Sequence, residues 1–317
     1  MQAMNVVIGV DIGGTKLSAA RIDAHGQVLL STVVPTDARG GQAHILGRLY
    51  EAIDAVIDSD VQAIGIGTAG KIDVVSGQVV YASDNLPGWT GTQLKALVST
   101  RYGLPVAIDN DVNAALLGER WLGAARRFAS VVMLALGTGV GGAVLMRGAL
   151  VRGHTWSAGE IGHMIFQAHG RPCNCGLRGC LEQYVSGTAL AVRYNERVGA
   201  NDTANDARDV FARLTDGDPF AIEVVDAFAA DLALAIRSLQ HILDPEAFII
   251  GGGVTNARAL WWHRLEAALE AFSDARPAVY AAELGNEATL YGAAKLALEL
   301  NIRHDEVNEG GDRNLTT

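Results

Sequence analysis

The sequence predicts an α/β protein made of two related halves, on the strength of three observations. Short apolar runs typical of strands alternate with segments whose apolar residues recur at helical spacing. Near the N-terminus, two such runs are joined by the glycine-rich loop Asp11-Ile-Gly-Gly-Thr-Lys16. A second strand–loop–strand unit is centred on Gly137-Thr-Gly-Val-Gly-Gly142. Because the pattern occurs twice, we expect two α/β halves that face each other rather than one barrel.

The first half is expected to open with three short strands and to continue with alternating helices and strands. Strands are predicted over 6–10, 17–22, 28–34, 63–68 and 106–109, and helices over 42–57, 92–101 and 112–121. The first of these helices has a clear period, because Ile45, Leu49 and Ile53 follow one another at helical spacing.

The second half repeats the strand pair and then becomes mainly helical. Strands are predicted over 131–136, 143–146 and 248–250, and helices over 207–214, 219–243, 258–272 and 287–300. Residues 301–317 are polar and show no periodicity, so we expect a flexible tail there.

Composition argues against strongly negative partners. The chain has 317 residues, with 25 basic against 35 acidic side chains and a formal net charge of −10. Phosphate backbones and anionic lipids would repel such a protein, so we expect neither nucleic acid nor membrane as a partner. The uncharged stretch 128–146 is close to the length of a membrane span, but its central glycines favour two strands and a loop.

The cysteines and the N-terminal segment indicate a reduced compartment. Only three cysteines occur, all within 173–180, which is not a disulfide framework. The first apolar run has no basic flank and is closed at once by Asp11, so we expect no signal peptide. These features predict a cytoplasmic location.

The first glycine loop is a candidate phosphate site. It follows a strand directly, and the amides around Gly13 and Gly14 are unobstructed by side chains. Thr15 adds a hydroxyl and Lys16 a cation, and Asp11 is placed to hold Mg²⁺ through water. An ordinary hairpin turn is the alternative interpretation.

The second and third glycine loops extend this interpretation. Gly137, Gly139 and Gly142 formally satisfy the dinucleotide fingerprint, with Glu160 near the distance of a ribose-binding acid, but that fingerprint must open a helix. Since a strand-like run follows here, a second phosphate-binding hairpin is favoured, contributed by Gly137, Thr138, Gly139 and Gly141. The Gly251, Gly252 and Gly253 loop suits an adenine or ribose beside bare backbone, or is simply a strand-to-helix turn.

One cluster has the spacing of a metal site. His163, Cys173, Cys175 and Cys180 supply four ligands of the zinc type within a short, glycine-rich segment, which predicts a structural Zn²⁺. Glu160 and Glu182 flank it. Held by the metal loop, these carboxylates and the imidazole would bind the hydroxyls of a polyol; otherwise they are solvated surface charges.

The candidate catalytic residue lies where a strand meets a helix. Asp109-Asn110-Asp111-Val-Asn113 contains more polar side chains than one helix cap requires. A carboxylate at the carboxyl end of a strand, beside phosphate loops, is well placed to act as general base towards an alcohol. We assign that role to Asp111, a substrate-orienting role to Asn110 and a structural role to Asp109.

Together these residues resemble the ROK family of sugar kinases and sugar-responsive regulators, from about residue 5 to residue 300. The resemblance rests on both glycine loops, on Asn110-Asp111, and on Glu160-Ile-Gly-His163 with Cys173-Asn-Cys-Gly-Leu-Arg-Gly-Cys-Leu-Glu182, the most specific of the motifs. It implies an actin-like (ribonuclease H-like) fold of two α/β domains. The smaller domain would comprise 1–113 with the returning helix 287–300, and the larger 114–286 with the zinc site.

The resemblance also implies an activity. MgATP would bind across the glycine loops and a hexose in the cleft, held by Gly70, Asn85, Asn110, Asp111, Glu160, His163 and Glu182. Asp111 would deprotonate the 6-hydroxyl, with glucose favoured as substrate and N-acetylmannosamine or N-acetylglucosamine as alternatives. The family usually forms dimers or tetramers. A sugar sensor without catalysis and a nicotinamide-dependent dehydrogenase are the more distant hypotheses.

Overall fold

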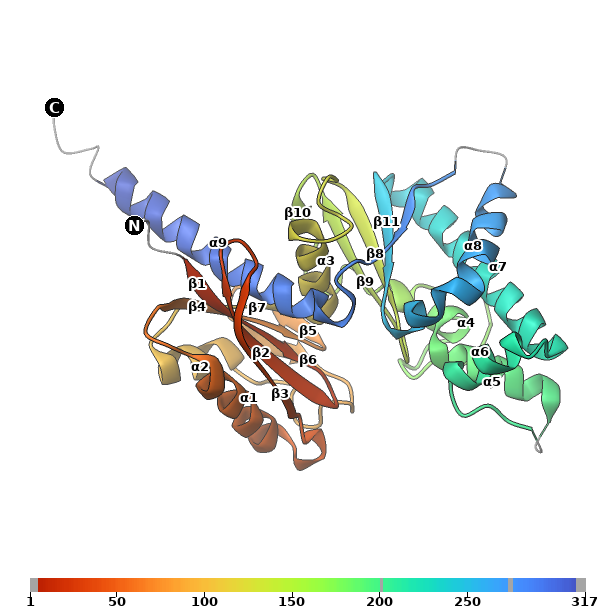
Figure 1. Cartoon of the computed structure of the whole chain (residues 1–317), viewed down its shortest axis with the longest axis horizontal. Helices are drawn as coiled ribbons and strands as arrows, with labels where there is room; N and C mark the ends of the chain where they lie inside the picture. Colours follow the sequence, from red (N-terminus) through yellow and green to blue (C-terminus); the bar gives the residue numbers. More distant parts are fainter. Residues whose placement is uncertain (1–4, 200–201, 273–275, 312–317) are drawn as a thin grey trace. The chain divides into compact units, whose positions relative to one another are not determined.

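The computed structural model describes residues 5–199, 202–272 and 276–311 (Figure 1). The chain divides into two compact units. The first comprises Met1–Arg126, Gly153–Ser157 and Glu287–Thr317, and the second Arg127–Arg152 and Ala158–Asn286.

The first unit is built on a five-stranded mixed sheet. Its strand order is β3-β2-β1-β4-β7, with β1 (Val6–Ile12), β2 (Lys16–Asp23), β3 (Val28–Pro35), β4 (Val61–Thr68) and β7 (Val106–Asn110). β1, β2 and β3 are the three opening strands that the sequence predicts, and they form an antiparallel meander, while β1, β4 and β7 run parallel. The carboxyl ends of these parallel strands therefore lie at the same edge of the sheet. There Asp11 of β1 pairs with Gly67 of β4, and Asn110 of β7 pairs with Thr68 of β4.

Helices cover both faces of this sheet, which explains why β1 is buried over nearly its whole length. α1 (Gln42–Val56) and α2 (Leu94–Tyr102) enclose one core with β1 and β4. α9 (Ala288–Gly311) packs on the other face and against α3 (Asp111–Trp121) (Figure 1). A small hairpin of β5 (Lys71–Asp73) and β6 (Gln78–Tyr81) follows β4.

Two glycines let α9 approach closely. A Cβ at Gly65 in β4 would collide with the carbonyl oxygen of Ala293, and a Cβ at Gly292 with that of Ala114 in α3. The sheet, α9 and α3 are thus in backbone contact at these points, which fixes the N-terminus of α3 relative to the sheet edge.

The second unit repeats the arrangement of the first. Its strand order is β10-β9-β8-β11-β12, with β8 (Val131–Leu136), β9 (Val140–Met146), β10 (Ala149–Leu150), β11 (Ala247–Gly251) and β12 (Val279–Ala281). β8 and β9 are antiparallel, whereas β8, β11 and β12 are parallel. The two predicted strand–glycine loop–strand units are therefore confirmed, and residues 128–146 form two strands, as expected.

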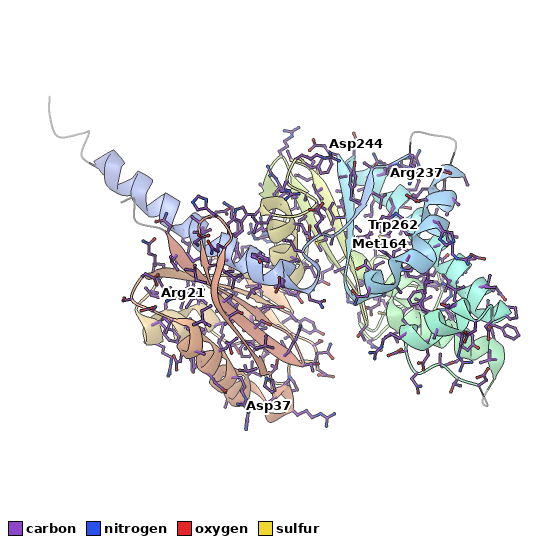
Figure 2. The ribbon with its side chains drawn as sticks, viewed as in Figure 1. Arg21, Asp37, Met164, Arg237, Asp244 and Trp262 are labelled. Carbon is purple, nitrogen blue, oxygen red and sulfur yellow. The ribbon has the colours of Figure 1, made fainter. Side chains whose placement is uncertain are left out.

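The α-helices described in the second unit are α4 (Glu182–Val185), α5 (Gly187–Val198), α6 (Ala207–Thr215), α7 (Pro219–Leu243) and α8 (Arg258–Glu270). They enclose one core with β8, β9 and β11, in which Trp261 packs edge-on against Phe228 at 5.4 Å. Met164 and Trp262, labelled in Figure 2, are half-buried at the margin of that core.

The structure differs from the sequence expectations in several places. The short elements α4, β10 and β12, the helix α5 and the β5–β6 hairpin were not predicted. The last helix runs to Gly311 rather than ending at residue 300, because helix-compatible residues continue as far as the glycine pair Gly310-Gly311. Of the tail expected over 301–317, residues 312–317 lie outside the described residues. In the part of the chain that is described, no helix combines the length and apolar character needed to cross a bilayer.

Candidate active site

The first glycine loop joins β1 to β2 and exposes its backbone. Gly14, Thr15 and Lys16 are exposed, and the Gly13 amide donates to the Lys16 carbonyl oxygen at 3.1 Å. Buried Thr36 holds the loop from behind: its Oγ1 donates to the Gly13 carbonyl oxygen (2.6 Å) and its amide to that of Thr15 (3.0 Å). An exposed loop fixed from behind is suited to binding phosphate oxygens through its amides.

Two carboxylates meet at the carboxyl end of the first sheet. Asp11 lies in β1, and Asp111 begins α3 directly after β7. Burial, together with the nearby charge of Asp111, raises the pKa of Asp11 to about 7, while Lys16 acts in the opposite direction. Because the two carboxylates repel, the pair favours either a proton or a divalent cation, and oxygen ligands of this kind suit Mg²⁺.

The polar run after β7 consists of a helix cap, a buried anchor and Asp111. Asn110 is the N-cap of α3, since its Oδ1 accepts from the amides of Val112 (2.9 Å) and Asn113 (3.2 Å). Asp109 is buried, and its Oδ1 accepts from the Asn110 amide (2.8 Å) and from Asn113 Nδ2 (2.9 Å). These bonds fix the turn that carries Asp111, whose own Oδ1 accepts from the Val112 amide at 2.9 Å.

Two further residues expected to bind substrate lie against this region. Asn110 Nδ2 donates to the Gly70 carbonyl oxygen at 3.0 Å. Gly70 has a φ of +112°, and a Cβ there would collide with the Tyr81 carbonyl oxygen, so glycine is required. Asn85 is exposed and lies beside the first glycine loop, because a Cβ at Gly14 would come 3.3 Å from its carbonyl oxygen. The first unit therefore brings this set of residues together.

The second glycine loop joins β8 to β9. The Gly137 amide donates to the Gly139 carbonyl oxygen at 2.9 Å, and the antiparallel ladder resumes at Val140. Thr138 is exposed. Because strand β9 follows the loop, the helix that a dinucleotide fingerprint requires does not begin here, and the interpretation as a second hairpin holds.

The four predicted metal ligands come together in the second unit. The ligand atoms of His163, Cys173, Cys175 and Cys180 all lie within 4.8 Å of one another. Cys173 Sγ is 3.7 Å from His163 Nδ1, and Cys175 Sγ is 3.6 Å from Cys180 Sγ. A tetrahedral Zn²⁺ with Zn–S distances of about 2.3 Å separates its ligands by about 3.7 Å, so this donor set fits that ion in both chemistry and spacing.

Glycine turns shape the metal loop. Gly176 and Gly179 both have positive φ, and a Cβ at Gly179 would collide with the Gln167 carbonyl oxygen. Burial, followed by hydrogen bonding with Cys175 and Cys173, raises the pKa of Cys180 to about 12. A thiolate at this position therefore requires a cation beside it, which again suits a metal ligand.

Glu160 lies on the turn that also carries His163. It precedes η2 (Ile161–His163), its side chain is exposed, and its carbonyl oxygen accepts from the His163 amide at 3.0 Å. Gly162 packs so closely on β9 that a Cβ would collide with the Val140 carbonyl oxygen. Glu160 and His163 are thus fixed beside the strand that follows the second glycine loop.

Glu182 is turned towards the same loop. Its Oε2 accepts from the Val140 amide at 3.0 Å, and it occupies the space that a Cβ at Gly139 would need. The structure therefore places this carboxylate against the glycine loop, a contact that sequence analysis did not anticipate.

A cavity of about 850 Å³ lies within the second unit. Its lining includes Gly137 and Thr138 of the glycine loop, the first turn of α5 at Gly187, and the first turn of α6 at Ala207. Phe211 contributes an aromatic wall. A concave, largely apolar space bordered by exposed backbone is suited to a planar base attached to phosphates.

One residue of the third glycine loop, Gly253, lines this cavity. Gly251 ends β11, and Gly252, with φ +85°, lies so close to Leu136 that a Cβ would collide with its backbone. Gly253 begins η3 (Gly253–Ala257) and lines the cavity. Gly251 and Gly252 thus shape the turn, while Gly253 borders the space.

Sequence analysis missed several lining residues of this cavity. They are Asn205 just before α6, Arg208 in its first turn, Asn195 and Thr188 in α5, and Asn256 in η3. The sequence does carry a signal for the two helix N-termini that border the cavity, because Ser186 and Asp206 are residues typical of N-caps. In the structure they cap α5 and α6, with their side chains accepting from the amides of Ala189, Arg208 and Asp209.

The chain is similar to known proteins over most of its length. The model of the ROK family matches residues 7–300. A glucokinase from Halalkalibacterium halodurans is 34% identical, covering 95% of this chain and 98% of its own length. An N-acetyl-D-glucosamine kinase from Yersinia pseudotuberculosis is 32% identical, covering 92% of this chain and 98% of its own.

A solved structure agrees with these relatives. The crystal structure of a ROK family glucokinase from Streptomyces griseus, in complex with glucose and AMPPNP, matches with a TM-score of 0.80 at 33% identity, covering 93% of this chain and 100% of that one. This likeness confirms the expected actin-like α/β fold. With the family model matching nearly the whole chain, the protein belongs to the ROK family.

Proposed function

We propose that this protein is an ATP-dependent kinase that phosphorylates the 6-hydroxyl of a hexose, with glucose as the preferred acceptor. The observation that carries the proposal is the placement of Asp111 on a fixed helix N-terminus, beside Asp11 and the first glycine loop. The glucokinases among its relatives support glucose as the acceptor.

The nucleotide would occupy both glycine loops. The cavity of the second unit would take the adenine and ribose, with Gly253 and Phe211 in its wall. The amides of Gly13, Gly14 and the 137–142 loop would bind phosphate oxygens, together with Lys16. Mg²⁺, held by Asp11 through water, would neutralise charge on the transferred phosphoryl group.

The hexose would be bound by hydroxyl-recognising groups from both units. We assign Gly70, Asn85, Asn110 and Asp111 of the first unit and Glu160, His163 and Glu182 of the second to this role. Asn110 already uses its Oδ1 to cap α3, so its remaining amide hydrogen is the group available to the sugar.

Asp111 would act as general base. As the 6-oxygen attacks the γ-phosphorus, the bond from that phosphorus to the bridging oxygen of ADP breaks. The hydroxyl proton passes to the Asp111 carboxylate. Since little covalent chemistry is required of the protein, most of the acceleration would come from positioning the two substrates.

The metal cluster would be structural zinc. His163 faces Cys173 through Nδ1, so Nε2 would be the nitrogen directed to a sugar hydroxyl. Zinc would fix the loop on which Glu160, His163 and Glu182 are carried, and would thereby hold their side chains in place for the sugar.

We also propose a cytoplasmic enzyme that forms homodimers or homotetramers. Three thiols that converge on one metal site require a reducing environment, which supports the location. The oligomeric state is carried over from the family resemblance, and light scattering of the purified protein tests it.

The test is ADP release from MgATP across a panel of glucose, mannose, fructose, allose, glucosamine, N-acetylmannosamine and N-acetylglucosamine. Strong turnover with glucose supports the proposal. Preference for an N-acetylhexosamine would favour the alternative that the Yersinia relative suggests. Hexose binding without ADP release from any sugar would instead indicate a sensor.

A further inference from the structure

The second glycine loop is held at two points by one short segment of chain. Near its end, the Val140 amide donates to Glu182 Oε2 at 3.0 Å. At its start, the Gly137 carbonyl oxygen accepts from the Gly187 amide at 2.7 Å. Glu182 is the first residue of α4 and Gly187 the first residue of α5, so residues 182–187 span the loop from one end to the other.

This segment is itself anchored beside the metal cluster. Cys180 lies two residues before Glu182, and Leu181 between them is fully buried. The Leu181 amide donates to the Met164 carbonyl oxygen at 3.0 Å, one residue after the ligand His163. The Glu182 side chain therefore projects from backbone that is fixed by this hydrogen bond and by core packing, directly after the candidate metal ligand Cys180.

The lack of a side chain at Gly139 makes room for the hydrogen bond between the Val140 amide and Glu182. A Cβ at Gly139 would meet Glu182 Oε2 and its carboxyl carbon before any other atom, and Gly139 is not among the residues with positive φ. An alanine there would be compatible with the backbone but would displace the carboxylate. The glycine at this position thus leaves room for the carboxylate.

We propose that Glu182 is a positioning residue for nucleotide binding, in addition to its assigned role towards the sugar. Its carboxylate fixes the 137–142 loop in the conformation that presents amides to phosphate, and it transmits the order of the metal loop to the nucleotide site. This inference rests on the proposed function, since it assigns ATP phosphates to that loop.

The physical reason is preorganisation. A mobile loop samples many backbone conformations, and a bound phosphate must order it at a cost in conformational entropy. A loop whose conformation is already fixed binds phosphate without that entropic cost. A hydrogen bond to an ionised carboxylate is among the stronger ones in proteins. Losing it would lower nucleotide affinity by about 10-fold.

Three variants separate the contact from other effects. Glu182→Ala removes the acceptor. Gly139→Ala keeps the carboxylate but expels it from its place. Glu182→Gln retains an oxygen that accepts from the Val140 amide while removing the charge. Gln183→Ala, one residue further along α4, is the matched control.

The measurement is calorimetric binding of Mg²⁺-AMPPNP in the absence of sugar, with metal content and thermal melting recorded for each variant. Glu182→Ala and Gly139→Ala should each weaken binding about 10-fold, and the double variant no more than either alone, because both remove one contact. Glu182→Gln should stay within about 3-fold of the unaltered protein, and Gln183→Ala should match it.

Amide hydrogen exchange of the nucleotide-free protein provides a readout that does not depend on ATP. The Val140 amide should exchange faster in Glu182→Ala and Gly139→Ala, but not in Gln183→Ala. Unchanged exchange and unchanged AMPPNP affinity in both variants would overturn the inference and leave the kinase proposal intact. Failure of the unaltered protein to bind AMPPNP would overturn both.

Discussion

The Asp111 carboxylate is supported by a buried hydrogen-bonded turn, so an amide in its place should leave the surrounding structure intact. We expect Asp111→Asn to lose on the order of 10²–10⁴ in kcat, with a modest change in sugar affinity, because the proton acceptor is lost while the other proposed sugar-binding groups remain. The same change at the exposed Asp60 is the control. Near-normal turnover in Asp111→Asn would mean that another group is the base.

Asp11 makes the metal-free protein sensitive to pH. Burial and the nearby charge of Asp111 raise the pKa of Asp11 from its ordinary value of 3.8 to about 7 in the folded state. Between these values the folded state holds a proton that the unfolded state releases, so stability should fall as the pH rises from about 4 to about 7, by on the order of 3 kcal/mol.

Asp11→Asn should remove that part of the pH dependence. In magnesium-free buffer the variant should melt at a higher temperature than the unaltered protein at pH 8, and the difference should shrink at pH 5. Thermal melts at the two pH values check this. A variant that is equally destabilised at both would show that Asp11 is a structural acceptor rather than a repelled carboxylate.

The packing of α9 on the first sheet depends on the absence of a side chain at Gly65 in β4. Gly65→Ala would drive a methyl group into the Ala293 carbonyl oxygen and should lower the free energy of unfolding by about 1–3 kcal/mol. The control is Gly47→Ala in α1, where nothing lies within 4 Å and alanine should add about 0.5–1 kcal/mol. Denaturant unfolding of both variants decides whether the packing of α9 requires this glycine.

We propose that the candidate sugar-binding residues of the second unit depend on the metal loop for their placement. We expect Cys175→Ser to lose the metal and to lower sugar affinity on the order of 10–100-fold, because Glu160, His163 and Glu182 lose their common support. Metal analysis and calorimetric sugar binding measure the two effects. A metal-free variant that binds sugar normally would contradict the proposed coupling.

Sequence patterns predicted the elements and sites that depend on neighbouring residues. Both glycine hairpins, the bounds of α7, and the metal ligands follow from local spacing, because each involves turns or a helix with its own period. α5 was missed because it opens with Gly187 and Thr188, which are weak helix formers, and its stability comes from the N-cap Ser186 and from core packing.

Contacts between distant segments were beyond sequence reasoning. The hydrogen bond from Thr36 to Gly13 and that from Val140 to Glu182 each join residues more than 20 positions apart in the sequence. Likewise, Asn205 and Arg208 border the cavity only because α6 folds back beside the glycine loop. Such pairings are set by how the elements pack, which no local pattern of residue types specifies.

At the scale of the whole molecule, the two units have an equivalent strand order but contain different candidate functional groups. The first unit supplies Asp111, Asp11 and a lysine-bearing loop, while the second supplies the metal cluster and the cavity. With a net charge of −10, the overall field of the protein would repel the phosphates of ATP, so the proposed site relies on local amides, Lys16 and a cation to attract them.

The most direct test of the central claim is the identity of the product formed from glucose and MgATP, followed by phosphorus and proton NMR. The account predicts stoichiometric ADP and a phosphate ester on the 6-oxygen of glucose, with both signals lost in Asp111→Asn. ADP without a phosphorylated sugar, or an unreacted mixture with the metal present in the protein, would contradict it.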